Sequence, residues 1–123
     1  MNEEQENIKN LLDIVDQKYY EAKRNKISRL DPKWGEWSRR MNLFLRKKID
    51  ESGPNRTAYQ YLFVYWLNRS QLLELYFKST IGQMSKKSTL KKEAVQLKQH
   101  VLNPLNAPPL NDKVILKRIT DNV

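Results

Sequence analysis

The sequence contains no cysteine, and this absence removes several kinds of chemistry at once. Without cysteine there can be no disulfide, no thiolate nucleophile and no sulfur ligand for zinc. His100 is the only histidine, which also excludes a multi-histidine metal site. We therefore expect no metal centre, and a fold that does not depend on an oxidising compartment.

Glycine and long apolar runs are scarce as well. The three glycines cannot build a phosphate-binding loop or a dinucleotide turn, and no serine lies in a G-x-S-x-G motif. The longest apolar run, Ala58 to Leu67, is interrupted by Gln60, and it covers about ten residues where a membrane span needs about twenty. The acidic N-terminal sequence has no apolar signal core. These absences predict no catalytic residues, no cofactor, no small-molecule substrate, no membrane contact and no secretion.

Positive charge is abundant. The chain has 23 lysines and arginines against 14 acids, a formal net charge of +9. Such an excess favours a nucleic acid, an anionic membrane surface or an acidic protein as partner. An apolar fraction of 39% with 10% aromatic residues is too high for a disordered basic tail. The chain is therefore expected to fold and to carry a basic surface.

Apolar residues recur at helical spacing in the first half of the chain. Residues from about Glu3 to Ile27 form a seam with alternating steps of four and three: Ile8, Leu12, Val15, Tyr19 and Ala22. Asp31-Pro32 opens a second helix, which Gly53-Pro54 stops. Its apolar stripe consists of Trp34, Trp37, Met41, Phe44 or Leu45, and Ile49.

The third segment, from Thr57 to about Met84, is the most hydrophobic. Its opening residues also suit a strand, but one stripe continues along its length and no hairpin turn lies nearby: Leu62, Trp66, Leu73, Phe77 and Met84. The sequence leaves open whether this segment is one helix or two helices joined by a kink at the polar residues 68–70. Because its middle is apolar on most sides, we expect this segment to be surrounded by the others.

The last part of the chain is shorter and more polar. Gly82 and residues 85–88 form a polar break, and a helix is expected from about Ser88 to Leu102. Prolines then define a linker over residues 104–111. Residues 112–123 fit a short helix capped by Asp112, or a strand added to a partner, and the helix is favoured.

These patterns predict an all-α fold, a small bundle of four or five amphipathic helices. The expected organisation is a helical domain over residues 1–103, a Pro-rich linker over 104–111, and a short C-terminal helix or partner-binding segment over 112–123. No internal repeat of 20–50 residues is visible.

Basic residues gather in three places along the sequence. Any one of these clusters would be explained by a solvated helix face, but together they favour contact with phosphates. The residues predicted to bind nucleic acid are Lys23, Arg24, Lys26, Arg29, Arg39, Arg40, Arg46, Lys47, Lys48, Lys86, Lys87, Lys91 and Lys92.

A second set of residues is predicted to contact a protein partner. The seam of the first helix can accept another helix, and the third segment has tyrosines on more than one side, which are hard to bury in so small a bundle. The predicted partner-binding residues are Ile8, Leu12, Val15, Tyr19, Tyr59, Tyr61 and Tyr65.

The hypothesis from sequence is a non-catalytic basic subunit of a larger nucleic-acid-handling complex, of the chromatin or transcription type. It would mediate assembly with other proteins and contact DNA or RNA through phosphates without reading sequence. We expect it in the nucleus, or in the cytoplasm if the source is not eukaryotic. The alternatives are a self-sufficient DNA- or RNA-binding regulator of viral or plasmid type, and a ribosome-associated protein.

Overall fold

The part of the chain that the structure describes folds into five α-helices. The computed structural model describes residues 3–51, 53–78 and 83–121. The helices are α1 (Glu3–Arg24), α2 (Pro32–Glu51), α3 (Arg56–Phe77), α4 (Met84–Leu102) and α5 (Asp112–Asp121), with a 3₁₀ turn, η2 (Pro104–Asn106), before α5. These described residues contain no strand. The predicted all-α bundle is confirmed.

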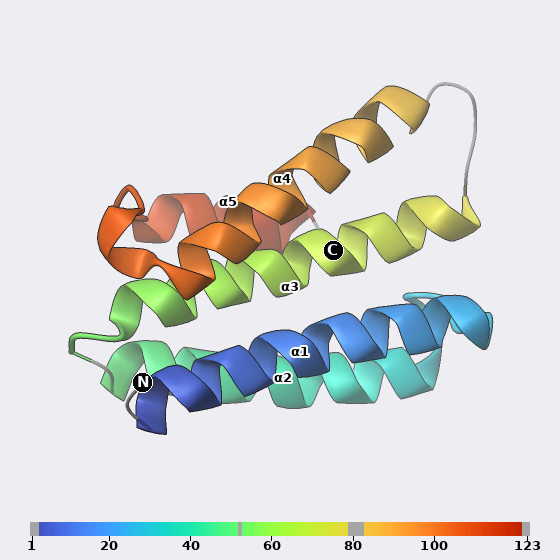
Figure 1. Cartoon of the computed structure of the whole chain (residues 1–123). Helices are drawn as coiled ribbons and strands as arrows, with labels where there is room; N and C mark the ends of the chain where they lie inside the picture. The colour runs from blue at the N-terminus through green and yellow to red at the C-terminus, as the bar shows by residue number, and fades with distance from the viewer. Residues whose placement is uncertain (1–2, 52, 79–82, 122–123) are drawn as a thin grey trace.

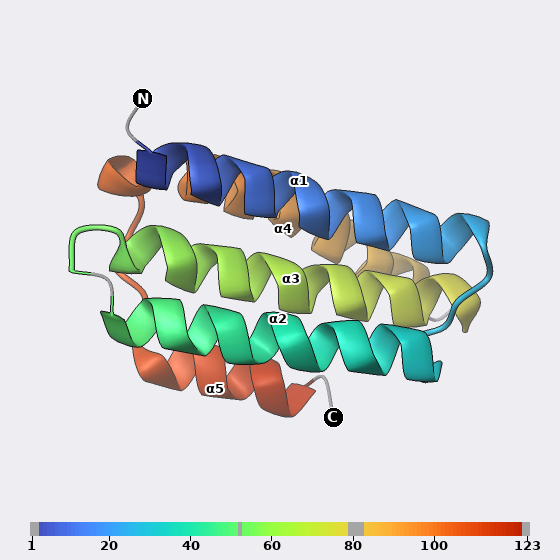
Figure 2. The same cartoon turned by 90° about the horizontal axis from the view of Figure 1, so that it is seen from below.

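Helix α3 is the centre of the bundle. Every residue from Ala58 to Asn68 is buried, so this part of the helix meets neighbours on all sides. Helices α1, α2, α4 and α5 all pack against it (Figure 1). Viewed from below, α1 and α4 lie on one side of α3, and α2 and α5 lie on the other (Figure 2). The expectation that the third segment is surrounded is confirmed.

Helix α1 places its seam where the spacing predicts, because all five seam residues are buried. It ends earlier than Ile27, however. The Ile27 N–H donates to the Ala22 carbonyl at 2.9 Å, and Lys26 takes a positive φ of 55°. This is a Schellman-type end, in which a left-handed residue turns the chain out of the helix.

Helix α2 begins with the predicted cap. The Lys33 N–H donates to Asp31 Oδ1 at 2.9 Å, and Pro32 occupies the first helical position, where its missing N–H costs nothing. Farther along, Leu45 is fully buried while 41% of Phe44 is exposed. Leu45, and not Phe44, is therefore the core residue at this point of the apolar stripe.

The boundary between the third and fourth helices differs from the prediction. Helix α3 ends at Phe77, and Met84 is the first residue of α4, so the expected stripe does not reach Met84 within one helix. Helix α4 also starts before Ser88. Residues 85–89 are accommodated in its first turns, with Thr89 Oγ1 donating to the Ser85 carbonyl at 3.0 Å. Gly82, expected in the polar break, lies outside the described residues.

Residues 68–70 do not break α3. The side chains of Asn68 and Arg69 bond to other helices instead of competing for the backbone. Asn68 Nδ2 donates to the Leu90 carbonyl at 3.0 Å and to Glu93 Oε1 at 2.8 Å, both on α4. Arg69 bonds to Asp16 on α1. The suggested division into two helices is wrong.

The C-terminal segment is a helix, as favoured, but Asp112 does not cap it. The Val114 N–H donates to Asn111 Oδ1 at 3.0 Å, whereas Asp112 lies 3.8 Å from Arg56. Ile115 joins the main core, and Arg118 fastens the helix to its neighbours. Arg118 donates to Glu93 on α4 at 2.7 Å and to Gln71 on α3 at 2.9 Å.

Candidate nucleic-acid interface

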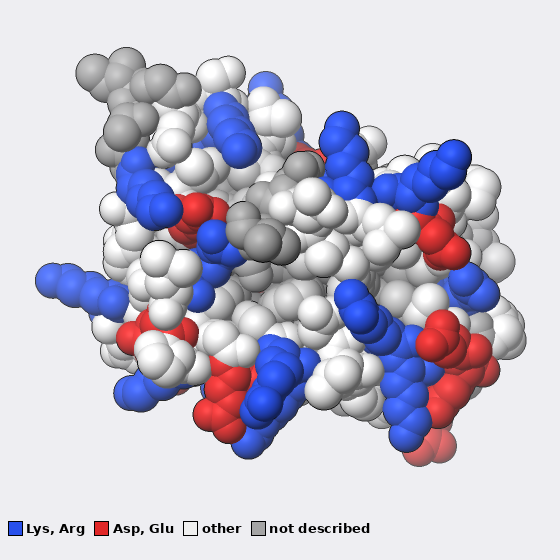
Figure 3. All heavy atoms as spheres, turned by 180° about the vertical axis from the view of Figure 1, so that it is seen from behind, with Lys and Arg blue, Asp and Glu red and all other residues white. Residues whose placement is uncertain are grey.

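Helix α2, which carries several of the predicted basic residues, lies on the other side of α3 from α4 (Figure 2). Some of these basic residues are paired within the helix: Arg40 with Glu36 at 2.8 Å, and Lys47 with Glu51 at 3.9 Å. Arg39 and Arg46 are exposed on the same helix. On the face seen in Figure 3, basic side chains alternate with acidic ones and do not form one continuous patch.

The other residues predicted to bind nucleic acid either contact side chains of the same chain or are exposed at separate places. The Arg29 Nε atom lies 3.2 Å from Glu74, and the Lys48 ammonium lies 5.8 Å from the ring centroid of Phe44. The remaining residues are exposed where α1 ends or on α4: Arg24, Lys26, Lys86 and Lys92.

Three of the predicted lysines come together although one of them, Lys23, lies more than sixty positions from the other two in sequence. Lys23 belongs to the last turn of α1, and Lys87 and Lys91 lie four residues apart near the start of α4. The Lys23 ammonium is 4.8 Å from the ring centroid of Tyr76 and 5.7 Å from that of Tyr20. The Lys87 ammonium is 5.5 Å from Tyr76. We call Lys23, Lys87, Lys91, Tyr20 and Tyr76 the lysine–tyrosine cluster.

The cluster lies at the end of the bundle where α1 and α3 end and α4 begins (Figure 1). The N-terminus of α4 carries a partial positive charge, which adds to the charge of its lysines. The first turn of α4 contains no acidic residue that would offset this charge. The local sequence therefore concentrates positive charge here without a built-in counterion.

The lysines in this cluster repel one another. The pKa of Lys23 is lowered, first by burial and then by the charges of Lys91, Lys87 and Arg69. The carboxylates on the same stretch of α1 are paired with other bases: Asp16 with Arg69 and Lys98, and Glu21 with Lys18. Within residues 3–51, 53–78 and 83–121, none of the three lysines has an ion-pair partner.

The two tyrosines of the cluster present ring surface to solvent. Tyr20 is 48% exposed and Tyr76 is 41% exposed. The adjacent Phe77 packs edge-on against Tyr76, with ring centroids 5.1 Å apart. Sequence reasoning did not select Tyr20 or Tyr76. For Tyr20 a signal was present, since it follows the seam residue Tyr19 and therefore lies about 100° around the helix from the seam.

The residues predicted to contact a protein partner are all buried inside the chain. Ile8, Leu12, Val15 and Tyr19 pack within the bundle, and so do Tyr59, Tyr61 and Tyr65. This expectation is therefore corrected: these side chains form the chain's own core and are not an available surface.

The three core tyrosines are buried because their hydroxyl groups reach partners at the edge of the core. The Tyr59 hydroxyl donates to Glu4, that of Tyr61 to the Pro108 carbonyl, and that of Tyr65 to Asp16. Burial raises the pKa of each of these tyrosines. A tyrosine can thus be packed in a small bundle when its polar end finds an acceptor.

Other chemistry has little support in the described residues. They contain no group of three or more histidines, cysteines or acids arranged to hold a metal ion. His100 packs against the Tyr61 ring, with centroids 4.8 Å apart. None of the described helices combines the length and the apolar character needed to cross a bilayer.

Comparison with protein-family models, with curated proteins and with solved structures finds no match to this chain.

Proposed function

We propose that this protein is a non-catalytic nucleic-acid-binding protein, and that the lysine–tyrosine cluster is its contact with a single strand. The observation that carries the proposal is the convergence of Lys23 with Lys87 and Lys91 without a carboxylate partner in the described structure. Bringing like charges together is unfavourable, and a bound polyanion would relieve the repulsion. Lys23 would then regain a pKa closer to its ordinary value.

The exposed tyrosines favour a nucleic acid over other polyanions. A single strand offers bases that stack on aromatic rings and phosphates that contact lysines, and the cluster presents both kinds of group side by side. Stacking and point-charge contacts discriminate little between bases. We therefore expect binding that is salt-dependent and only weakly sequence-selective.

The assembly part of the sequence hypothesis stays a prediction. The residues selected to bind other subunits are core residues, so membership in a chromatin or transcription complex has no identified surface. A nuclear setting likewise stays a prediction. The cluster can serve either a complex subunit or a self-sufficient binder, because it is complete within this one chain.

The proposal is tested by charge reversal with a matched control. One variant carries Lys23→Glu, Lys87→Glu and Lys91→Glu, and the other carries Arg39→Glu, Arg40→Glu and Lys47→Glu on α2, so both change the net charge equally. Binding of a labelled single-stranded oligonucleotide is followed by fluorescence anisotropy at several salt concentrations. Circular dichroism checks that both variants stay helical.

The cluster variant should bind at least about tenfold more weakly and should lose about 2 from the slope of log affinity against log salt, since each phosphate contact to a single strand contributes about 0.7. The α2 variant should change both quantities much less. Equal losses in the two variants would show that only total charge matters. Absence of binding by the wild-type chain at low salt would also refute the proposal.

A further inference from the structure

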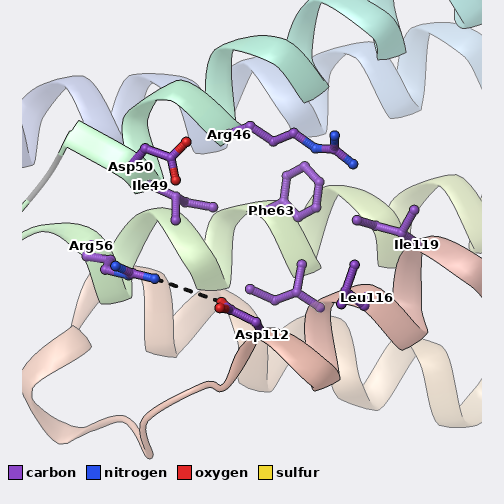
Figure 4. Close-up of a pocket in the computed structure, with 9 residues that line it drawn as sticks. Arg46, Ile49, Asp50, Arg56, Phe63, Asp112, Leu116 and Ile119 are labelled. Carbon is purple, nitrogen blue, oxygen red and sulfur yellow. Dashed lines mark ion pairs between the residues drawn. The ribbon is translucent and has the colours of Figure 1, made fainter.

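A cleft with two chambers lies between α2 and α5, on the side of α3 away from the lysine–tyrosine cluster. The larger chamber, about 390 Å³, is mostly apolar, and Phe63, Ile49 and Leu116 line it (Figure 4). Two arginines and two aspartates stand at its rim, and Arg56 pairs there with Asp112. The rim therefore has no net charge.

The second chamber, about 230 Å³, is lined by Trp34, Gly35, Ser38, Asn42, Trp66 and Ser70, among others. Ile119 lines both chambers, so the two adjoin at this side chain. The cleft thus combines an apolar part with a part that is rich in groups able to form hydrogen bonds.

Four polar atoms around the second chamber have no hydrogen-bond partner in the described structure: Ser38 Oγ, Asn42 Oδ1, Trp66 Nε1 and Ser70 Oγ. Only 5% of Trp66 and 4% of Ser70 is exposed, so these two residues have little contact with bulk solvent. Buried polar groups without partners are unfavourable and uncommon, and four around one chamber call for a common explanation.

We infer that this cleft binds a small, neutral, amphipathic molecule. Its apolar body would occupy the chamber beside Phe63 and Leu116. Its polar end would bond to the Trp66 N–H and to the serine hydroxyls after rotation of these side chains toward the chamber, because all of these polar atoms are buried in the described structure. A charged ligand is disfavoured because the rim of the first chamber is balanced, and because Arg29, which lines the second chamber, is paired with Glu74 at 3.2 Å. The inference does not depend on nucleic-acid binding, because the two sites share no residue.

The test uses the full chain and three probes: decanol, which has an apolar body and a hydroxyl end, decane, which has only the body, and glycerol, which has only hydroxyls. The indole N–H resonances of the three tryptophans are followed by NMR, and Trp66→Phe assigns the resonance of Trp66. Two glycine variants accompany the wild type. Gly35 lines the polar chamber and a Cβ there meets nothing within 4 Å, so Gly35→Leu should fill the chamber without a clash at Cβ.

Gly53→Leu is the matched control, because Gly53 has equally open surroundings but does not line the cleft. We expect decanol to shift the Trp66 indole resonance, to bind at least about tenfold more tightly than decane or glycerol, and to lose about three- to tenfold in Trp66→Phe. Gly35→Leu should abolish the shift, and Gly53→Leu should keep it.

The inference is overturned if decanol leaves the Trp66 resonance unchanged. It is equally overturned if decane binds as well as decanol, which would indicate adventitious apolar partitioning only, or if Gly35→Leu binds decanol as the wild type does.

Discussion

Asp16 is an acidic side chain of α1 that holds three helices together. It accepts hydrogen bonds from Tyr65 and Arg69 on α3, the latter at 3.1 Å, and from Lys98 on α4 at 2.9 Å. Arg69 Nε also donates to the Tyr65 hydroxyl at 3.0 Å. Because the side chains of Asp16 and Arg69 are mostly buried, this network counts for more than a surface ion pair.

The Tyr65 hydroxyl gives this network a testable pH dependence. Burial, followed by the bond to Asp16, raises the pKa of Tyr65. A raised folded-state pKa means that the stabilisation is complete below about pH 10, where an unfolded tyrosine keeps its proton, and is lost as the pH rises further. Tyr65→Phe should therefore lower the free energy of unfolding at pH 7 by about 1–3 kcal/mol.

The difference between wild type and Tyr65→Phe should shrink above about pH 10, as measured by urea unfolding at several pH values. Tyr20→Phe is the control, because the Tyr20 side chain is half exposed. It should change stability little at either pH. A wild-type–variant difference that stays constant with pH would contradict the prediction.

At the scale of single elements, the end of α1 stores backbone strain. Lys26 adopts a left-handed conformation in which its Cβ is crowded, and glycine would take the same position without that cost. Lys26→Gly should therefore raise the free energy of unfolding by about 0.5–1 kcal/mol, measured by urea titration. Lys26→Ala removes the same charge but keeps the Cβ, so it should give no such gain. Equal effects of the two substitutions would attribute the change to charge instead.

Elements whose apolar stripe faces one neighbour were predictable from sequence. The seam of α1 and the start of α2 follow from residue spacing and from the Asp31 cap, and both are observed. The boundary between α3 and α4 was not predictable by the same reasoning. Met84 happens to continue the spacing of the α3 stripe, and periodicity alone does not reveal that it belongs to the next helix.

The candidate sites could be predicted only in part, since they depend on the arrangement of the whole bundle. Lys23 and Lys87 were selected for their local charge, but their meeting requires α1 and α4 to lie on the same side of α3. The buried tyrosines were misread for a related reason. Their acceptors, such as Glu4 for Tyr59, lie on other elements and are not visible near them in sequence.

The net charge of +9 should affect the whole molecule in two opposite ways. Salt screens the repulsion between its like charges, so the free energy of unfolding should rise modestly between about 0.05 and 0.5 M sodium chloride. Over the same range the affinity for a single strand should fall steeply, because phosphate contacts release counterions. Thermal unfolding and anisotropy in the same buffers measure both. A parallel fall of stability and affinity would instead indicate that loss of folding explains the loss of binding.

The central position of α3 has a consequence for synthesis of the protein. Helices α1 and α2 leave the ribosome before α3, yet both pack mainly against it. At about 5–20 residues per second, several seconds separate the appearance of the α1 seam from that of the helix that covers it. During this interval the nascent chain exposes Leu12, Val15 and Leu45, which are among the most deeply buried residues of the finished protein. The growing chain is therefore a target for chaperones that bind apolar helices, and its need for them ends when α3 emerges.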